Sequence, residues 1–351
     1  MTNFPAIKLL SPGASVWDKF CSEHEHGHLL QMSRWGLLKQ QTGWYAHRLI
    51  ISDDERIRAG AQVLVQKRFG LAMCYVPRGP LFCDDLMINH ALVAAINRYA
   101  TEQNAIAVRY EPFVAYEHQR TALFEKALTA TEHSINKTIQ PQHTVITQLT
   151  DAESLKELTD QQLLTSFSKG HRADIKKAER AGVTIRYGTG ANDIATFSQL
   201  MNETGARANF DVHPQAYYQT VWDLFGTIDH ATLILADYNG QTIAGALIVG
   251  GANTVNYLYG GSRVEAFQHG ANHLIQWSAL RWARDHGYAQ YDFWGIPYRK
   301  DEAPADGEQA SMTGLIRFKK GFGGDEVSFM PAYTHILKPT LYHLVKTRFS
   351  I

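Results

Sequence analysis

The pattern of apolar and polar positions divides the first half of the chain into short strands and helices. Apolar runs bounded by turn residues predict strands, and apolar residues repeated every three to four positions predict helices. The predicted elements are, in order, a helix within 17–28, a helix over 31–41, strands over 44–52, 57–69 and 71–76, a helix over 91–103 and a strand over 105–110.

The second half repeats this order of elements. It predicts strands over 232–238, 243–249 and 255–259, a helix over 274–286 and a strand over 289–293. Asn239-Gly240 is a strong hairpin turn between the first two of these strands. Local text recurs as well, because Ile57-Arg58-Ala59-Gly60-Ala61 resembles Ile243-Ala244-Gly245-Ala246 at an offset of about 185 residues. We therefore favour a duplicated domain over two unrelated α/β domains that share common parts.

The length of 351 residues also favours two domains. We place the first at 1–150 and the second at 151–329. A short amphipathic helix over 340–347 must dock somewhere, and we expect the segment 330–351 to pack on the first domain. The fold class is α/β (α+β).

A helical segment over 160–181 separates the two repeats. Asp160 is a plausible N-cap, and Gly182 suits the left-handed position that ends a helix before a strand begins at Val183. Apolar residues supply a buried side, and the outward positions are mostly basic. The basic residues are Lys169, Arg172, Lys176, Lys177 and Arg180.

Composition limits the partners and the compartment. The 34 basic residues balance 34 acidic ones, so a nucleic acid would have to meet a local basic patch. Three cysteines without metal spacing suit a reducing cytoplasm. Neither a signal peptide nor a transmembrane stretch is predicted. We expect a cytoplasmic monomer whose contact with the inner face of the membrane is at most peripheral.

The sequence predicts no metal site and no covalent nucleophile. Histidines alternate at His24, His26 and His28, where a solvated loop is the favoured interpretation and a metal site the alternative. A Gly-x-Ser-x-Gly elbow is absent, and no cysteine stands in a catalytic motif.

The duplicated layout, with a glycine break before a long helix, resembles the N-acetyltransferase (GNAT) fold. Members of that superfamily hold a pyrophosphate on a Gln/Arg-x-x-Gly-x-Gly/Ala segment at the start of this helix. The corresponding stretch here, 267–273, keeps only Gly270, and 83–90 has no glycine. An acyl-CoA-dependent N-acyltransferase of a small molecule is therefore an alternative that the sequence favours less.

The chain resembles the Fem (FemABX) aminoacyltransferases over nearly its whole length. The likeness is carried by 30–39 (Leu-Gln-Met-Ser-Arg-Trp-Gly-Leu-Leu-Lys), 75–80 (Tyr-Val-Pro-Arg-Gly-Pro), 109–112 (Arg-Tyr-Glu-Pro), 172–183, 257–262 (Tyr-Leu-Tyr-Gly-Gly-Ser), 291–296 (Tyr-Asp-Phe-Trp-Gly-Ile) and 314–324 (Gly-Leu-Ile-Arg-Phe-Lys-Lys-Gly-Phe-Gly-Gly).

The resemblance implies tandem GNAT-like domains that transfer an amino acid from aminoacyl-tRNA to the stem peptide of a peptidoglycan precursor. The acceptor would be UDP-MurNAc-pentapeptide or lipid II. Aminoacyl-tRNA would be a co-substrate, and no cofactor is implied. Because 172–182 runs directly into the strand at Val183, the chain resembles the FemX-like branch that lacks a coiled-coil arm.

The resemblance also implies roles for particular residues. Lys319 would meet the charge that forms on the ester carbonyl, and Phe318 would position the adenosine end of the donor. Lys39 and Arg207 would bind the acceptor's phosphates. Ordinary exposed cations at helix or loop ends are the alternative for these basic residues.

Two tyrosines and two carboxylates complete the candidate site. The resemblance implies that Tyr257 and Tyr259, which lie two apart on a strand and so are expected on one face, line the acceptor channel. Glu111 and Asp292 occupy corresponding places in the repeat and are candidates for the amine's proton. We favour Glu111 as an acceptor-site residue, although the family pattern more often has Asp there. The ribose hydroxyl of the tRNA could instead relay the proton.

The basic face that contains Arg172, Lys176 and Lys177 is the candidate path for the tRNA, with a solvated helix face as the alternative. A second competing function is a non-catalytic scaffold that binds cell-wall precursors. Retention of Phe318, Lys319 and both tyrosines argues against a scaffold.

Overall fold

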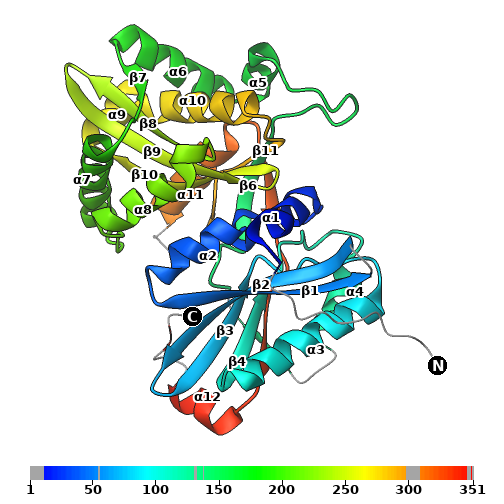
Figure 1. Cartoon of the computed structure of the whole chain (residues 1–351). Helices are drawn as coiled ribbons and strands as arrows, with labels where there is room; N and C mark the ends of the chain where they lie inside the picture. The colour runs from blue at the N-terminus through cyan, green and yellow to red at the C-terminus, as the bar shows by residue number, and fades with distance from the viewer. Residues whose placement is uncertain are drawn as a thin grey trace. The chain divides into compact units, whose positions relative to one another are not determined.

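The computed structural model of the chain (Figure 1) describes residues 12–53, 56–129, 133–136, 138–297, 309–345 and 349. It divides into two compact units. Unit 1 contains Met1–Gln142 and Ser328–Ile351, and unit 2 contains His143–Val327. The chain therefore passes into unit 2 after Gln142, somewhat earlier than the boundary expected at residue 150.

Unit 1 is built on a mixed sheet whose order is β1-β2-β3-β4-β13-β5. The strands are β1 (Trp44–Asp53), β2 (Arg56–Arg68), β3 (Leu71–Pro77), β4 (Ala105–Glu111), β13 (Ala332–Ile336) and β5 (His133–Asn136). Neighbouring strands are antiparallel except β3 and β4, which are parallel. A parallel pair needs a crossover connection, and the helix α3 (Leu86–Glu102) supplies it.

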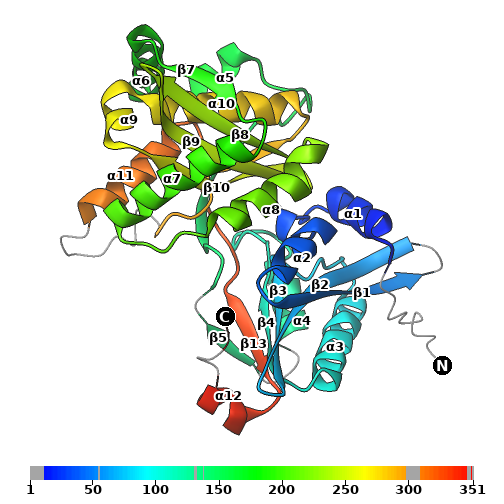
Figure 2. The ribbon, with the colours of Figure 1, turned by 60° about the vertical axis from the view of Figure 1, so that its left-hand side comes forward.

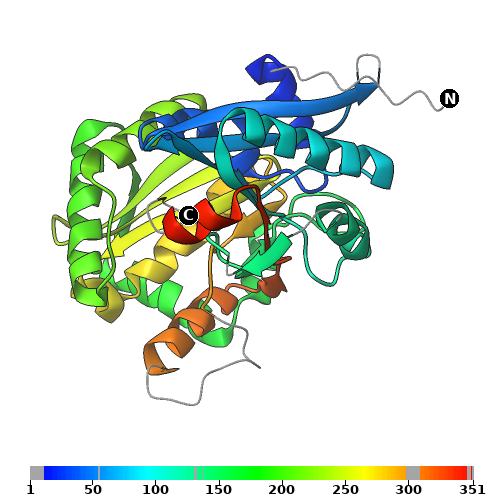
Figure 3. The ribbon, with the colours of Figure 1, turned by 90° about the horizontal axis from the view of Figure 1, so that it is seen from below.

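The remaining helices of unit 1 cover the same sheet. They are α1 (Ala14–Glu23), the 3-10 turn η1 (Leu29–Gln31), α2 (Ser33–Gln40), α4 (Thr121–Leu128) and α12 (Pro339–Val345). Helix α12, red in Figure 3, buries Tyr342 against Met73, Ile106 and Ala107 of the sheet. The C-terminal segment thus contributes a strand, β13, and a docked helix to the unit that begins the chain.

Unit 2 repeats this plan in a larger sheet of order β12-β6-β11-β10-β9-β8-β7. The strands are β12 (Asp325–Ser328), β6 (His143–Gln148), β11 (Gln290–Asp292), β10 (Thr254–Ser262), β9 (Gln241–Gly251), β8 (Ala231–Tyr238) and β7 (Thr184–Tyr187). Strands β8, β9 and β10 are antiparallel, β10 and β11 are parallel, and α10 (Ala271–Asp285) joins the parallel pair. The predicted recurrence of hairpin, third strand, helix and further strand is therefore present in the structure, and the further strand is parallel to the third in both units.

Helices cover both faces of the unit 2 sheet (Figure 2). They are α5 (Asp160–Ser166), α6 (Lys169–Ala181), α7 (Ala191–Ala208), α8 (Gln215–Phe225), the 3-10 turn η2 (Gly226–Ile228), α9 (Val264–His269) and α11 (Gln309–Lys320), in addition to α10. Helix α10 packs its apolar residues on one face, and α7 packs on the other so closely that a Cβ at Gly245 would lie 3.0 Å from Phe197.

The single helix predicted over 160–181 is wrong, because the segment forms two helices that are separated at Phe167 and Ser168. The N-cap of α5 is Thr159, not Asp160, and it forms a capping box with Gln162. Ser168 caps α6 by accepting the N–H of His171. Such a cap inside an apolar-periodic segment starts a new helix, which the periodicity alone did not reveal. Gly182 ends α6 in the left-handed region with φ 84°, as predicted.

Candidate functional site

Lys319 is a buried lysine in the last turn of α11. Only 6% of its surface is exposed, so the alternative of an ordinary exposed cation at a helix or loop end does not describe it. Its Nζ donates hydrogen bonds to the carbonyl oxygens of Trp294 at 2.8 Å and Gly295 at 2.7 Å. Burial lowers the pKa of Lys319 to about 8, and the opposing effect of Asp292 is smaller. The ammonium is therefore held in a fixed place with a pKa near the physiological range.

Asp292 stabilises the turn whose carbonyl groups bind Lys319. This fully buried carboxylate accepts the backbone N–H of Trp294 at 2.7 Å and the hydroxyl of Thr144. Trp294 has φ 57°, a left-handed conformation that a bulky residue rarely adopts and that surrounding contacts must maintain. A structural task is thus visible for Asp292, which bonds the turn before Gly295, and its part in proton transfer stays a prediction.

Phe318 precedes the lysine and lies in a cluster of rings. Its ring centroid is 5.1 Å from that of His273, 5.4 Å from Phe322 and 6.0 Å from His171. The ring is partly exposed, so part of it is available to a ligand while the histidines and Phe322 hold it in place. The two histidines were not predicted as part of this site.

The glycines after Lys320 allow close packing against α5 and α6. A Cβ at Gly321 would lie 1.9 Å from the ring of His171, and one at Gly323 would lie 2.2 Å from the hydroxyl of Ser166. The N–H of Ser168 donates to the carbonyl of Gly321 at 2.8 Å. The glycine-rich bend is therefore a docking point for the junction between α5 and α6.

Tyr257 and Tyr259 point to opposite faces of the sheet, so the prediction that they share a face is wrong. The register between β10 and β9 shifts between Asn256 and Tyr259, which is a β-bulge. A bulge inserts one residue and reverses the alternation beyond it. Tyr257 consequently packs on the side of α10, where Gln276 is its hydrogen-bond partner. Tyr259 lies on the side of α7 and α8.

An aromatic cluster surrounds Tyr259. Its hydroxyl donates to the hydroxyl of Tyr217 at 3.3 Å, and Tyr217 stacks on His213 with ring centroids 3.9 Å apart. Burial raises the pKa of Tyr259 well above its ordinary value, and Tyr217 and Tyr218 add to this effect. The Tyr259 hydroxyl therefore stays protonated and uses its proton to orient Tyr217, whose own hydroxyl can donate to a ligand. Tyr217 and His213 lie on or beside α8, and neither was predicted as a site residue.

Arg207 lies within the last turn of α7. Its guanidinium carbon is 5.6 Å from the ring centroid of Phe267, an aromatic residue of α9 that is 60% exposed. A guanidinium that rests on an exposed ring keeps its donors available to an anionic group.

In unit 1, Lys39 lies in the last turn of α2, where its Nζ is 4.9 Å from the ring centroid of Trp35. Lys39 and Arg207 therefore belong to different units, each at a helix C-terminus and each beside an aromatic ring.

Glu111 ends β4 and is 1% exposed. Its carboxylate accepts the backbone N–H groups of Ile139 at 2.6 Å and Gln140 at 3.0 Å, and the hydroxyl of Tyr75 at 2.8 Å. These bonds attach the segment around residue 140 to the end of the strand. A structural task is thus visible for Glu111, and its part in catalysis stays a prediction.

The three predicted tRNA-binding residues differ in their surroundings. Arg172 donates to the carbonyls of Leu164 and Phe167 and so caps the C-terminus of α5. Lys176 is exposed and lines a hollow of about 440 Å³ beside Trp277. Lys177 is also exposed but lies nearer to His273, on another side of α6. Of the three, the two lysines remain the better candidates for contact with a polyanion.

The comparisons with known proteins agree with these motifs. The sequence profile of the FemAB family matches residues 13–242 and 236–348. The chain belongs to the FemAB family. A FemAB relative, the lipid II:glycine glycyltransferase of Staphylococcus saprophyticus, is 24% identical over 400 aligned positions that cover 94% of this chain and 93% of the relative.

Solved structures place the FemAB fold among tandem acetyltransferase-like proteins. The crystal structure of FemX matches with a TM-score of 0.84 at 23% identity and covers 96% of this chain and 99% of that one. A tandem GNAT protein from the clavulanic acid biosynthesis pathway matches with a TM-score of 0.51 at 10% identity over 84% and 83% of the chains. The predicted tandem GNAT-like fold is confirmed.

Two further features of this FemAB chain bear on the predictions that it lacks a coiled-coil arm and a transmembrane stretch. Helix α6 is followed directly by β7, with no coiled-coil arm between them. Within the described ranges, none of the helices combines the length and the apolar character that crossing a membrane requires.

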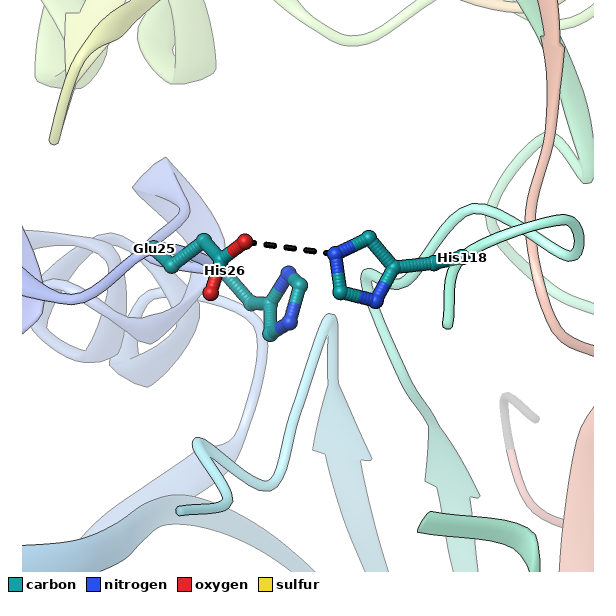
Figure 4. Close-up of side chains that lie close together, drawn as sticks. All are labelled: Glu25, His26 and His118. Atoms are coloured by element: carbon teal, nitrogen blue, oxygen red, sulfur yellow. Dashed lines mark hydrogen bonds and ion pairs between the residues drawn. The ribbon is translucent and has the colours of Figure 1, made fainter. Parts of the chain in front are cut away.

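A group of three residues that could hold a metal ion lies outside this site, in unit 1. Glu25, His26 and His118 bring potential ligand atoms within 4.8 Å of one another (Figure 4). The Nδ1 of His118 accepts the backbone N–H of Arg120 at 3.2 Å, so its Nε2 carries a proton, which it donates to Glu25 at 3.2 Å. Arg120 also pairs with Glu25. These bonds occupy the carboxylate and one imidazole, and we assign no metal here.

The solvated loop predicted around these histidines is wrong. His26 and His28 are 7% and 0% exposed, and only His24 is partly exposed. The His24 ring bonds the carbonyl of Phe82 at 2.9 Å. Burial lowers the pKa of His26 to about 4. His24 and His26 are therefore packed against the protein rather than solvated, and burial lowers the pKa of both.

Proposed function

We propose that this chain transfers an amino acid from aminoacyl-tRNA to the amine of a peptidoglycan stem peptide, and that lipid II carries this peptide. The observation that supports the proposal most strongly is a buried, anchored lysine, Lys319, in a chain of the FemAB family. The name of the relative, a lipid II:glycine glycyltransferase, supports the acceptor class and suggests glycine as the amino acid. UDP-MurNAc-pentapeptide is the second candidate acceptor.

The reaction needs a cation beside the ester carbonyl of the donor. The acceptor amine attacks that carbonyl, an amide bond forms, the ester bond breaks, and the ribose oxygen leaves with a proton that the amine gives up. Lys319 has three N–H donors, and the carbonyls of Trp294 and Gly295 take two of them. The third donates to the oxyanion in the transition state, where a single fixed donor contributes about 10²–10³ in rate.

The other predicted residues serve recognition in this proposal. Phe318 offers the exposed part of its ring to the terminal adenine of the donor. Lys39 and Arg207 are each candidates to bind phosphates of the acceptor, and the Tyr259–Tyr217 pair offers a hydroxyl to its polar groups, whereas Tyr257 lies on the other face of the sheet toward α10. Glu111 remains a candidate acceptor-site residue of unit 1, where it holds the segment around residue 140. No cofactor is required, because the donor ester is already activated.

An acyl-CoA enzyme would use the N-terminus of α10 for a pyrophosphate, and here α6 packs against that turn. A Cβ at Gly270 would lie 2.5 Å from the carbonyl oxygen of Asp174. The carboxylate of Asp174 is 3.7 Å from Nε2 of His273, in the first turn of α10. An acidic side chain near a helix N-terminus takes the place that a phosphate would need. This packing favours the tRNA ester as donor.

Both substrates of the proposed reaction are made in the cytoplasm, so we place the protein there. That the chain is a monomer stays a prediction. We expect peripheral contact with the inner membrane face when lipid II is the acceptor.

Reconstitution with purified components tests the proposal. The chain is incubated with charged tRNAs and with either lipid II or UDP-MurNAc-pentapeptide, and the product is identified by mass spectrometry. Transfer to a precursor that Lys319→Ala abolishes and Lys320→Ala preserves supports the proposal; Lys320 is the matched control because it is the exposed neighbour that pairs with Glu326. Transfer from acetyl-CoA, or no transfer from any charged tRNA, would refute it in favour of the acyl-CoA or the scaffold function.

A further inference from the structure

The C-terminus of α11 is held by a side chain from α6. Nε2 of His171 lies 2.8 Å from the carbonyl oxygen of Phe318. The last four carbonyls of a helix lack partners within the helix, and Phe318 belongs to this turn. His171 is 7% exposed, and its ring lies against the rings of His273 and Phe322 at centroid distances of 4.7 Å and 4.6 Å.

The hydrogen bonds define the tautomer of this histidine. A carbonyl oxygen only accepts, so Nε2 carries the proton that is donated to Phe318. Nδ1 of the neutral ring must then accept, and the hydroxyl of Ser168 lies 2.8 Å from it. The same hydroxyl oxygen accepts the backbone N–H of His171 at 3.2 Å as the N-cap of α6. Ser168 thus fixes both the start of the helix and the orientation of the ring.

Helices α6 and α11 are tightly packed at this contact. The N–H of Ser168 donates to the carbonyl of Gly321 at 2.8 Å, and a Cβ at Gly321 would lie 1.9 Å from the His171 ring. The start of α6, the positive end of its dipole, therefore meets the end of α11, the negative end of its dipole. One residue from the bonded carbonyl, Lys319 extends into the turn formed by Trp294 and Gly295.

We propose that His171, oriented by Ser168, is a positioning residue that holds the last turn of α11 so that the Lys319 ammonium stays inserted at the 294–295 turn. It acts through the backbone and does not touch the reacting atoms. The inference rests on the proposed function for its catalytic consequence, but the insertion of Lys319 can be measured without any substrate.

Trace acetylation of the native protein gives that measurement. Lys319 and Lys320 are neighbours in one proteolytic peptide, one buried and one exposed, so their labelling ratio by mass spectrometry reports the insertion of Lys319 with an internal reference. We expect His171→Ala to raise the ratio of Lys319 to Lys320 labelling by about tenfold, the worth of one hydrogen bond with its packing. An unchanged ratio in a folded His171→Ala protein would overturn the proposal.

Three variants make this result specific. His171→Gln keeps an amide donor of similar reach and should restore most of the protection. Ser168→Ala removes the orienting hydroxyl, and it should raise the ratio by a smaller factor and leave the fold intact. His286→Ala is the matched control, because His286 bonds a carbonyl of α10 at 2.8 Å from an exposed position and should change nothing. A rise in the control equal to that of His171→Ala would also overturn the proposal.

Turnover separates this inference from the proposed function. With charged tRNA and lipid II, His171→Ala should lower kcat about fivefold to tenfold and change the KM for the precursor by less than twofold, and His171→Gln should recover kcat. An effect on KM alone would contradict positioning of the lysine. If the wild-type chain transfers nothing, the proposed function fails while the labelling ratio still decides whether His171 holds Lys319.

Discussion

Glu111→Gln distinguishes a structural carboxylate from a catalytic one. The substitution keeps the size of the side chain and one carbonyl oxygen, but it replaces the second oxygen by an NH₂ group. In the structure both oxygens accept hydrogen bonds, from Ile139 and Gln140 of the backbone and from the Tyr75 hydroxyl. The amide group must therefore turn a donor toward a donor, whichever way it is oriented.

The magnitude follows from these bonds. Hydrogen bonds to a buried charged acceptor contribute about 1.5–3 kcal/mol each, and a buried donor left without a partner costs about 1–3 kcal/mol. Glu111→Gln weakens the remaining bonds and abolishes at least one, so we expect unit 1 to lose about 2–4 kcal/mol of stability. A general base would behave differently, since its removal costs about 10²–10⁴ in rate. We expect kcat per folded molecule to change by less than threefold.

Hydrogen exchange and turnover together provide the assay. Amide exchange of a peptide that covers residues 138–146 should accelerate in Glu111→Gln, because the N–H groups of Ile139 and Gln140 lose their acceptor. Glu125→Gln is the matched control, since Glu125 is exposed and accepts a 3.3 Å bond from the Tyr333 hydroxyl. It should change stability by less than about 0.5 kcal/mol. Unchanged exchange with a hundredfold loss of kcat would refute the structural role and restore Glu111 as a base.

The remaining predictions concern the cations. Lys319→Ala should lower turnover about 10²–10³-fold with a smaller effect on substrate binding. Because the pKa of Lys319 is lowered to about 8, the ammonium loses its proton above that pH and wild-type kcat should fall. Lys319→Arg stays charged and should lack this decline. Lys39→Ala and Arg207→Ala should raise the KM for the precursor and leave tRNA affinity unchanged in binding titrations. Lys176→Ala or Lys177→Ala should reduce the slope of log affinity for tRNA against log salt by about one unit, but not both, since they lie about 100° apart on α6; unchanged slopes in both would remove α6 from the tRNA path.

The parts of the fold that depend on local chemistry could be predicted from the sequence. The hairpin turn at Asn239-Gly240 and the helix end at Gly182 are dictated by backbone conformations that few residues adopt, and both lie where they were expected. The recurrence of strands and helices followed from apolar runs that are buried on both faces of each sheet. These signals are contained within a few consecutive residues, which is why a single sequence suffices to read them.

The side-chain directions in the site depended on longer-range packing. One extra residue in β10 places Tyr257 and Tyr259 on opposite faces of the sheet. The sequence of the 254–262 strand contains no single residue that would have predicted this bulge. The burial of Lys319 depends on the 294–295 turn, which arrives from a distant part of the chain. The start of α6 did carry a signal in the sequence, because serine is a preferred N-cap residue and Ser168 stands directly before the basic helical segment.

The surroundings of Lys319 explain how a helix end can hold a buried cation. A buried ammonium without partners would destabilise the protein. In Lys319, two carbonyls and a nearby carboxylate compensate in part for the lost hydration, and its pKa is about 8. The carbonyls are available only because Trp294 adopts a left-handed conformation that Asp292 holds in place. The cost of this arrangement is spread over α6, the turn and the sheet, so residues of three elements together determine where the ammonium lies.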